Sequence, residues 1–425
     1  MGKIAVIQLA SRIHGEGYVR DMAEILKEYV GMFDGATIIP EVVTGINDVE
    51  FIAKKFRGYY PVLVFLTGGT SRLARTLMHF MGVDSAVFIA HGEHNSLPSA
   101  ISARARLELE GVFSWIFTCH DPKGSECRRV LSEALKTTVA VSSIKNSKIC
   151  LVGLDEVSNE VECFRRSFNA EVSIISTSEF ESLIMSQRDS TYVKEFLEII
   201  RDVLGASGGQ LKEIGAIYAA LKKLFMRGGY SAIAVNCFPY LIKHKVTPCL
   251  ALAALNSNGY IAGCEADLNA LFLMMLSKYL TGLSGWIANP SSISEGKLYL
   301  AHCTAALELL RNPRAISHFE SGYPYGLTGE LKYREVTLAS VDYEFTAIAA
   351  AKTIVLESGQ LNDLMCRTQA VLKLDFPAEV FPQIALANHH VVMSGDLRRY
   401  LRAVSHLLGL AYIEYSRLAE EAGSE

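Results

Sequence analysis

A long apolar run, an excess of charge of one sign and a clear pairing of cysteines would each place a chain in a specialised class of protein, and all three are missing from this sequence. No uninterrupted apolar run reaches membrane-spanning length, since the nearest, residues 268–280, is broken by Asn269, Ser277 and Lys278. The 41 Lys and Arg residues nearly balance the 45 Asp and Glu residues, so charge gives no support for binding to nucleic acid or to acidic membranes. We therefore predict a soluble globular protein with neither a nucleic-acid nor a membrane partner.

The cysteines also lack an obvious pairing. The chain has nine of them, an odd number, and no two are arranged as CxxC. This pattern predicts reduced thiols and a cytoplasmic location, with most cysteines, such as Cys150 and Cys163, buried as small apolar residues. The apolar run at residues 4–7 is too short for the core of a signal peptide, and we interpret it as a first strand.

A length of 425 residues suggests two or three domains. The first 145 residues alternate short β-rich runs with amphipathic helical segments, which predicts a parallel sheet covered by helices on both faces. The expected strands are residues 4–9, 62–66, 86–90 and 115–119. The expected helices are residues 18–29, 71–81, 99–110 and 126–135. Working loops are then expected at the carboxyl ends of the strands, at residues 11–15, 67–70 and 91–96.

The rest of the chain predicts two further domains. After a linker at residues 142–147, the strand-then-helix pattern restarts, with strands at 148–153, 172–175 and 232–237 and helices at 160–167 and 192–225. From about Arg311 the runs become short and β-branched, as at 336–341 and 353–356, which favours an antiparallel barrel or sandwich closed by a helix at 397–408. The predicted fold is two doubly wound α/β domains, 1–145 and 146–310, followed by a β-rich, barrel-like C-terminal domain, 311–425.

The glycine-rich loop at residues 67–70 follows a strand and precedes a helix, so its amides could receive an anion. It lacks, however, both the GxGxxG spacing and the Gly-Lys-Ser/Thr ending of the phosphate-binding motifs. A tight turn between strand and helix needs glycine in any case, and we favour that simpler role.

An acidic motif at residues 263–268, GCEADL, is the strongest candidate for chemistry. Its two carboxylates, Glu265 and Asp267, are two residues apart between an extended segment and a helix, so both can face one point. Asp267 stands where a helix N-cap belongs, and Asp is among the best N-caps. Capping does not account for Glu265, which follows small and apolar residues and needs a cation or a donor nearby if it is buried.

Several histidines could complete a site with these carboxylates. His302 ends a strand-like alternation, His318 is followed by Phe and Glu, and His389 precedes His390. Adjacent side chains diverge, so one of the last pair at most is expected to face the site. Carboxylates with one imidazole suit Mn²⁺ or Mg²⁺, although neighbouring cysteines, Cys264 and Cys303, leave Zn²⁺ open.

The sequence resembles the superfamily of L-fucose isomerase and L-arabinose isomerase, and in particular its archaeal-type L-fucose isomerase-like members. The resemblance covers nearly the whole chain. Each matching segment is short, and it is the order and spacing of the segments that carry the resemblance. These segments are residues 94–98, 247–252, 263–268, 301–304, 318–320, 366–369 and 388–389.

The resemblance implies a ketol isomerase of three domains that acts on an open-chain aldose with a bound divalent metal, usually Mn²⁺. The family holds its metal with a Glu, an Asp and a His; its Asp matches Asp267 and its His matches His389. The region that corresponds to its Glu, residues 237–243, has no carboxylate here, and we assign that part to Glu265. The resemblance also implies self-association, with the N-terminal domain of a neighbouring subunit covering the active site.

The sequence thus predicts a metal-dependent isomerase of a small sugar such as L-fucose or D-arabinose. Two alternatives stay open: a related metal enzyme that performs a lyase or epimerase step on a sugar or sugar acid, and a sugar-binding protein without turnover. The expected metal ligands are Glu265, Asp267 and His389, the first two also serving in catalysis. The expected substrate contacts are His302, Glu320, Asn388, Arg12 and Asn95.

Overall fold

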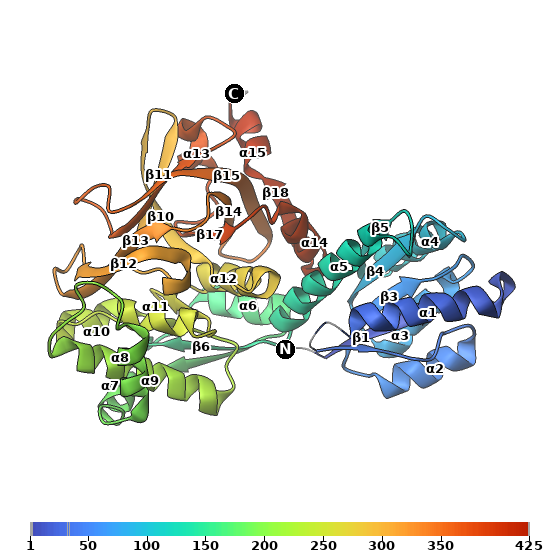
Figure 1. Cartoon of the computed structure of the whole chain (residues 1–425), viewed down its shortest axis with the longest axis horizontal. Helices are drawn as coiled ribbons and strands as arrows, with labels where there is room; N and C mark the ends of the chain where they lie inside the picture. Colours follow the sequence, from blue (N-terminus) through green and yellow to red (C-terminus); the bar gives the residue numbers. More distant parts are fainter. Residues whose placement is uncertain (1–2, 32, 34, 424–425) are drawn as a thin grey trace. The chain divides into compact units, whose positions relative to one another are not determined.

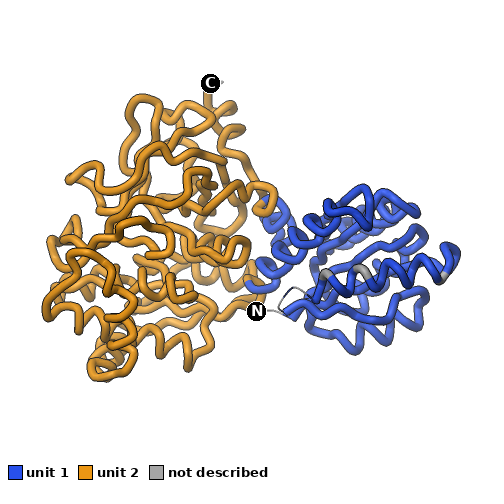
Figure 2. Tube along the Cα trace, viewed as in Figure 1, with its two compact units in different colours: residues 1–143, 402–410 blue, residues 144–401, 411–425 orange. Residues whose placement is uncertain are grey.

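The computed structural model describes residues 3–31, 33 and 35–423, and the chain divides into two compact units (Figure 2). The first unit comprises residues 1–143 and 402–410, and the second comprises residues 144–401 and 411–425. The finer division at residues 145 and 310 stays a prediction. Among the described residues, no helix combines the length and the apolar character needed to cross a membrane.

The first unit contains a five-stranded parallel sheet in the order β2-β1-β3-β4-β5, one of the common doubly wound orders (Figure 1). Its strands are β1 (Ile4–Leu9), β2 (Ala36–Ile38), β3 (Tyr60–Phe65), β4 (Ser85–His91) and β5 (Phe113–Cys119). Its helices are η1 (Arg12–His14), α1 (Glu16–Val30), α2 (Ile46–Lys55), α3 (Ser71–Met81), α4 (Ser96–Leu109) and α5 (Ser125–Ile144). Every residue of β1 and β4 is buried, as expected for parallel strands covered on both faces.

The four strands predicted here are confirmed, whereas β2 and α2 were not predicted. Strand β2 has three residues, none of them fully buried, so it leaves no apolar run in the sequence. The predicted linker at residues 142–147 is also wrong in its first half, because α5 continues to Ile144. The hydroxyl of Ser142 donates a hydrogen bond to the carbonyl oxygen of Val139 at 3.3 Å. This serine is therefore accommodated inside α5 and does not terminate the helix.

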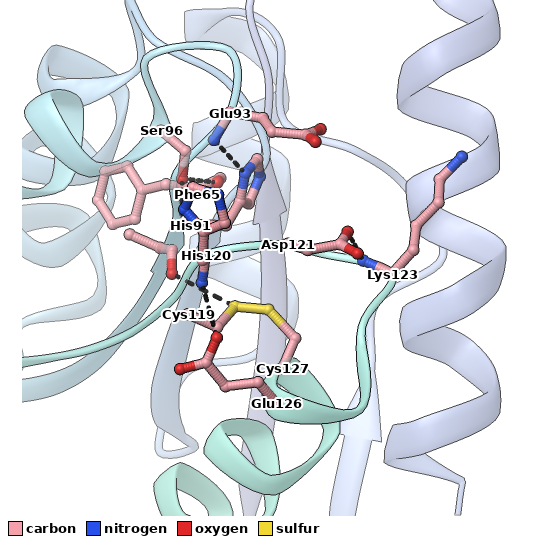
Figure 3. The surroundings of a disulfide bond; sticks show 11 residues. Phe65, His91, Glu93, Ser96, Cys119, His120, Asp121, Lys123, Glu126 and Cys127 are labelled. Carbon is pink, nitrogen blue, oxygen red and sulfur yellow. Dashed lines mark hydrogen bonds between the residues drawn. A yellow bond between two sulfur atoms is a disulfide. The ribbon is translucent and has the colours of Figure 1, made fainter.

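The expectation that all thiols are reduced is wrong at one pair. Cys119 ends β5 and Cys127 lies in the first turn of α5, and the two form a disulfide beside His120 and Glu126 (Figure 3). The turn between strand and helix brings their Cα atoms to 5.2 Å, within the usual range for a disulfide. Their sequence separation of eight residues is not that of a CxxC motif, so the pairing becomes visible only in the fold.

The second unit begins with a four-stranded parallel sheet in the order β7-β6-β8-β9, of which Figure 1 labels β6. Its strands are β6 (Lys148–Val152), β7 (Glu171–Ile175), β8 (Ala232–Val235) and β9 (Ala262–Cys264). Its helices are α6 (Asn159–Phe168), α7 (Thr177–Met185), α8 (Thr191–Ile199), α9 (Gln210–Gly228), α10 (Cys237–His244), α11 (Cys249–Ser257) and α12 (Leu268–Thr281). The helix predicted over residues 192–225 is therefore two helices. Gly205, in the break between them, has a φ of +80°, and a Cβ there would lie 2.6 Å from the carbonyl oxygen of Ala315.

An antiparallel barrel of six strands follows in the same unit, closed because β14 pairs with both β17 and β15. Around the barrel the strands are β14 (Glu335–Val341), β17 (His390–Ser394), β10 (Trp286–Ser294), β11 (Lys297–His302), β16 (Thr368–Lys373) and β15 (Ala347–Gly359). The ribbon of β12 (Leu310–Ser317) and β13 (Pro324–Leu331) is separate. The predicted barrel is confirmed as an antiparallel barrel, whereas its separation as a domain of its own stays a prediction. Its first strand begins at Trp286, earlier than the expected change of pattern at Arg311.

The remaining elements are short. They are η2 (Leu307–Leu309), η3 (Ala378–Val380), α13 (Phe381–Ile384), α14 (Arg398–Leu408), β18 (Ala411–Glu414) and α15 (Tyr415–Ala422). The predicted closing helix at residues 397–408 is α14, but it does not close the chain. Strand β18 follows it and adds to β15 in parallel.

One hydrophobic core joins the parallel sheet of the second unit to its barrel. It includes Leu250 from α11, Trp286 from β10 and Leu298 from β11. The indole nitrogen of Trp286 donates to the carbonyl oxygen of Thr304 at 3.1 Å, so the largest buried side chain leaves no polar atom unpaired. Helix α12 also packs on β14 and β17, so the helix that begins at Asp267 lies directly against the barrel.

We predict that Gly285→Ala destabilises the second unit by about 1–3 kcal/mol, the usual cost of overpacking. A Cβ at Gly285 would lie 2.4 Å from Cγ1 of Val391 and 3.4 Å from Cα of Met274, where α12 meets β17. The matched control is Gly209→Ala, since Gly209 has a helical φ of −64° and open space around its Cβ position. Urea unfolding of both variants measures the difference, and an equal loss in both would contradict this account of the packing.

Candidate functional site

The acidic motif lies at the carboxyl end of the parallel sheet of the second unit. Glu265 directly follows β9, and Asp267 is the N-cap of α12. From the barrel, His302 ends β11 and His389 directly precedes β17. Four side chains from two layers that share one core therefore meet at one place. Glu265, Asp267 and His389 are among them, and their role as metal ligands stays a prediction.

The turn that presents the two carboxylates is conformationally costly. Glu265 and Ala266 have φ angles of +59° and +50°, in the left-handed region that non-glycine residues seldom adopt. Each such residue costs roughly 1–2 kcal/mol. The turn is held by hydrogen bonds from the amide of Ala266 to the carbonyl oxygen of Val235 at 3.0 Å and from the amide of Asp267 to that of Cys264 at 3.2 Å. Strain of this kind often marks a functional site.

Asp267 uses both carboxylate oxygens. Oδ1 accepts the amide of Ala270 at 2.7 Å, so the predicted capping role is confirmed. Oδ2 lies 2.7 Å from Nδ1 of His389. Burial disfavours the protonated form of His389, but the hydrogen bond to Asp267 and the charges of Asp267 and Glu265 outweigh burial and raise the pKa of this ring. Capping and contact with the histidine are thus two functions of one side chain.

Glu265 lies between two buried imidazoles. Its Oε1 is 3.4 Å from Nε2 of His302, and its Oε2 is 3.7 Å from Nε2 of His389. The two ring centroids are 5.5 Å apart. Burial opposes ionisation of this carboxyl, but contact with His302 and the charges of His302, His389 and His318 prevail and lower the pKa of Glu265. The site therefore keeps an anion beside two histidines.

Three nitrogens of these rings are buried without a hydrogen-bond partner in the described part of the chain: Nδ1 and Nε2 of His302 and Nε2 of His389. An unpaired buried polar group costs about 1–3 kcal/mol, so such groups call for an explanation. A sulfur of Cys264, an oxygen of Glu265 and a nitrogen of His302 also lie within 4.8 Å of one another. Unpartnered nitrogens around a carboxylate fit a divalent cation, and nitrogen, oxygen and sulfur are all suitable donors.

A cleft of about 410 Å³ opens beside this group. Glu265, Asp267, His389 and Asn388 line it, in agreement with the predicted site. The further lining residues that were not predicted include Glu156, Ser158, Glu160, Asn236 and Tyr343. All but Tyr343 lie beyond the carboxyl ends of β6 or β8, in the sheet whose strand β9 carries Glu265. Their positions after neighbouring parallel strands could have pointed to them.

The other predicted substrate contacts lie elsewhere. His302 is only 2% exposed and Glu320 is exposed, and neither lines the cleft among the residues described. Glu320 instead contributes negative charge near His318, whose Nδ1 lies 3.1 Å from the hydroxyl of Ser321. The remaining two residues belong to the first unit. Arg12 donates to the hydroxyl of Thr44 at 3.3 Å and Asn95 precedes α4, so their contact with substrate stays a prediction.

We predict that Asp267→Asn lowers the pKa of His389 while α12 remains intact, because Asn also caps helices well but carries no charge. Histidine ring resonances followed by NMR against pH in metal-free protein measure this change. His91, in the first unit, is the internal control: burial lowers its pKa, and that pKa should stay constant in the variant. An unchanged pKa of His389 would contradict the assignment of the pair.

The same pair predicts a pH dependence of stability. Asp267 raises the folded-state pKa of His389 above its unfolded value of about 6.5. The pair therefore stabilises the fold fully below that pH, and its contribution is lost as the pH rises through the folded-state pKa. Without metal, the excess stability of the wild type over Asp267→Asn should shrink between mildly acidic and alkaline pH. Urea unfolding at several pH values checks the sign, and a widening gap would refute it.

No family model matches the sequence. Over 99 residues the chain is 32% identical to a sulfoquinovose isomerase from Clostridium sp. (strain MSTE9). The match covers 22% of this chain and spans 22% of the length of that relative. This partial similarity supports a relationship to sugar isomerases, which is consistent with the resemblance drawn from the sequence motifs.

Proposed function

We propose that this chain is a metal-dependent aldose–ketose isomerase that acts on a small sugar. The observation that carries the proposal is the meeting of Glu265, Asp267 and His389 beside a cleft of about 410 Å³ at the carboxyl end of a parallel sheet. Ligand sites of open α/β sheets usually lie at this edge. The partial similarity to a sulfoquinovose isomerase supports the isomerase class.

The reaction explains why such a site needs carboxylates. Moving a carbonyl between C1 and C2 requires removal of a proton from carbon, and a bound divalent ion would polarise the adjacent oxygens of the sugar. Glu265, kept ionised by its histidine neighbours, is the base that we assign. Glu156 and Glu160 line the same cleft, so either can supply the second carboxylate that returns the proton.

The polar lining of the cleft suits a sugar. Asn236, Asn388, Ser158 and Tyr343 offer amide and hydroxyl groups, which donate to and accept from sugar hydroxyls. Mn²⁺ as the natural ion and self-association belong to the same proposal and rest on the resemblance of the sequence. A cytoplasmic location is also part of the proposal and rests on the cysteine pattern.

We expect the purified protein loaded with Mn²⁺ to interconvert at least one aldose–ketose pair among L-fucose, D-arabinose, L-arabinose and sulfoquinovose. In D₂O the product should carry deuterium at C1 or C2, and treatment with EDTA should abolish the exchange. Glu265→Gln should lower the rate by about 10²- to 10⁴-fold, the usual contribution of a general base.

The matched control is Glu198→Gln, which changes an exposed carboxylate on α8 and should leave the rate unchanged. The proposal fails if no sugar of the panel exchanges deuterium although the protein is folded and metal is bound. Equal rates in Glu265→Gln and the control would remove Glu265 from its assigned role.

A further inference from the structure

We propose that the ribbon of β12 and β13 carries a second binding site, for a small sugar that bears an anionic group such as a phosphate ester or a sulfonate. A cavity of about 340 Å³ lies on this ribbon, and the described residues that line it are all different from those of the cleft at Glu265. The proposal does not depend on the proposed isomerase activity.

The register of the ribbon gathers four polar side chains on one face (Figure 1). Arg311 pairs with Glu330 and Arg314 pairs with Thr328, and cross-strand partners share a face of the sheet. Glu330 and Thr328 are two residues apart on β13, so both pairs lie on the same side. A bulge between Arg311 and Arg314 brings the two arginines onto that side although they are three residues apart.

The other face of the ribbon is apolar. Three of its residues are buried in the core of the second unit, and they are Leu310, Ala315 and Leu327. The core therefore fixes which face of the ribbon is turned outward, and the polar face lines the cavity.

The first argument for an anion is the state of the two arginines. Arg311 and Arg314 are exposed, and neither guanidinium forms an ion pair or a hydrogen bond within the described part of the chain. Glu330 is the single carboxylate among the described lining residues, so the lining keeps a net positive charge. A guanidinium presents a planar fork of N–H donors that matches the oxygens of a phosphate or sulfonate.

The second argument is the hydroxyl of Thr328. This side chain lines the cavity and is only 1% exposed, and its Oγ1 is buried without a hydrogen-bond partner among the residues described. A buried hydroxyl without a partner is unfavourable and calls for an explanation. Because Arg314 is its neighbour across the ribbon, a ligand oxygen held by that guanidinium lies beside this hydroxyl and gives it a partner.

The opposite wall offers groups that suit sugar hydroxyls. It is the end of β15, which contacts β13. The hydroxyl oxygen of Ser358 accepts the amide of Leu331 at 2.8 Å, so the hydroxyl hydrogen of Ser358 remains to donate. Gln360 donates through Nε2 to Asp363 at 2.7 Å, so its Oε1 can accept. A cavity of this volume is in the range of sites for organic ligands, which favours an anionic sugar over a bare inorganic anion.

Calorimetric titration of the metal-free full chain with fructose 6-phosphate and with sulfoquinovose tests the site. At least one of them should bind, and the tighter ligand identifies the anionic group. Fructose and inorganic phosphate should each bind at least about tenfold more weakly, because each lacks one part of the recognised chemistry. Equally tight binding of fructose or of inorganic phosphate, or no binding of either anionic sugar, overturns the proposal.

Variants of the arginines locate the bound ligand. Arg311→Gln and Arg314→Gln should each lower the affinity by about tenfold or more, since each removes a charged hydrogen-bond donor. The matched control is Arg417→Gln, which removes an exposed arginine on α15 and should keep the wild-type affinity. Wild-type affinity in both cavity variants would place the ligand elsewhere, for example in the cleft at Glu265, and overturn the proposal.

Thr328→Val separates a ligand contact from a structural role. Valine has a similar shape without the hydroxyl, and the hydroxyl has no partner among the residues described, so the variant should unfold at the same urea concentration as the wild type or at a higher one. Its affinity for the anionic sugar should nevertheless fall by about tenfold. A loss of stability with unchanged affinity contradicts the assignment of Thr328 to the ligand.

Discussion

The hydrogen bond between Asp267 and His389 is the contact on which the site depends. It joins the N-terminus of α12 to the start of β17, two segments 122 residues apart in the sequence. One oxygen of Asp267 accepts the amide of Ala270 in the first turn of the helix, and the other faces an imidazole of the barrel. A helix N-terminus attracts negative charge, so a carboxylate suits this capping position.

This arrangement needs rigid support, because several of its parts are unfavourable by themselves. The consecutive left-handed residues Glu265 and Ala266 and the unpartnered nitrogens of His302 and His389 each cost free energy. The core shared by the parallel sheet and the barrel, which includes Leu250, Trp286 and Leu298, supports them from both layers. Residues that are unfavourable locally and well supported globally are typical of sites shaped by function.

The chemistry of the site follows from the contrast between two neighbouring histidines. His389 faces Asp267 and Glu265, which raise its pKa, whereas burial lowers the pKa of His390 to about 4. His390 points the other way and contacts the hydroxyl of Tyr415 at 2.8 Å. The divergence of adjacent side chains at a strand end thus separates a histidine that faces the cleft from one that belongs to the core.

Much of the local structure was determined by the sequence itself. Strand β1, helix α3 and the capping role of Asp267 depend on apolar spacing and on residues within one turn, so they can be predicted without the fold. Other features appear only in three dimensions. The disulfide of Cys119 and Cys127, the shared cleft of Glu160 and Glu265, and the choice of which nitrogen of His389 faces Asp267 all depend on how distant segments pack. The sequence identified the carboxylates because their local pattern was unusual. Only the closed barrel and its shared core could decide which imidazoles reach them. His302 is 37 residues from Glu265 and His389 is 122 residues from Asp267, and contacts over such separations leave no local pattern in the sequence.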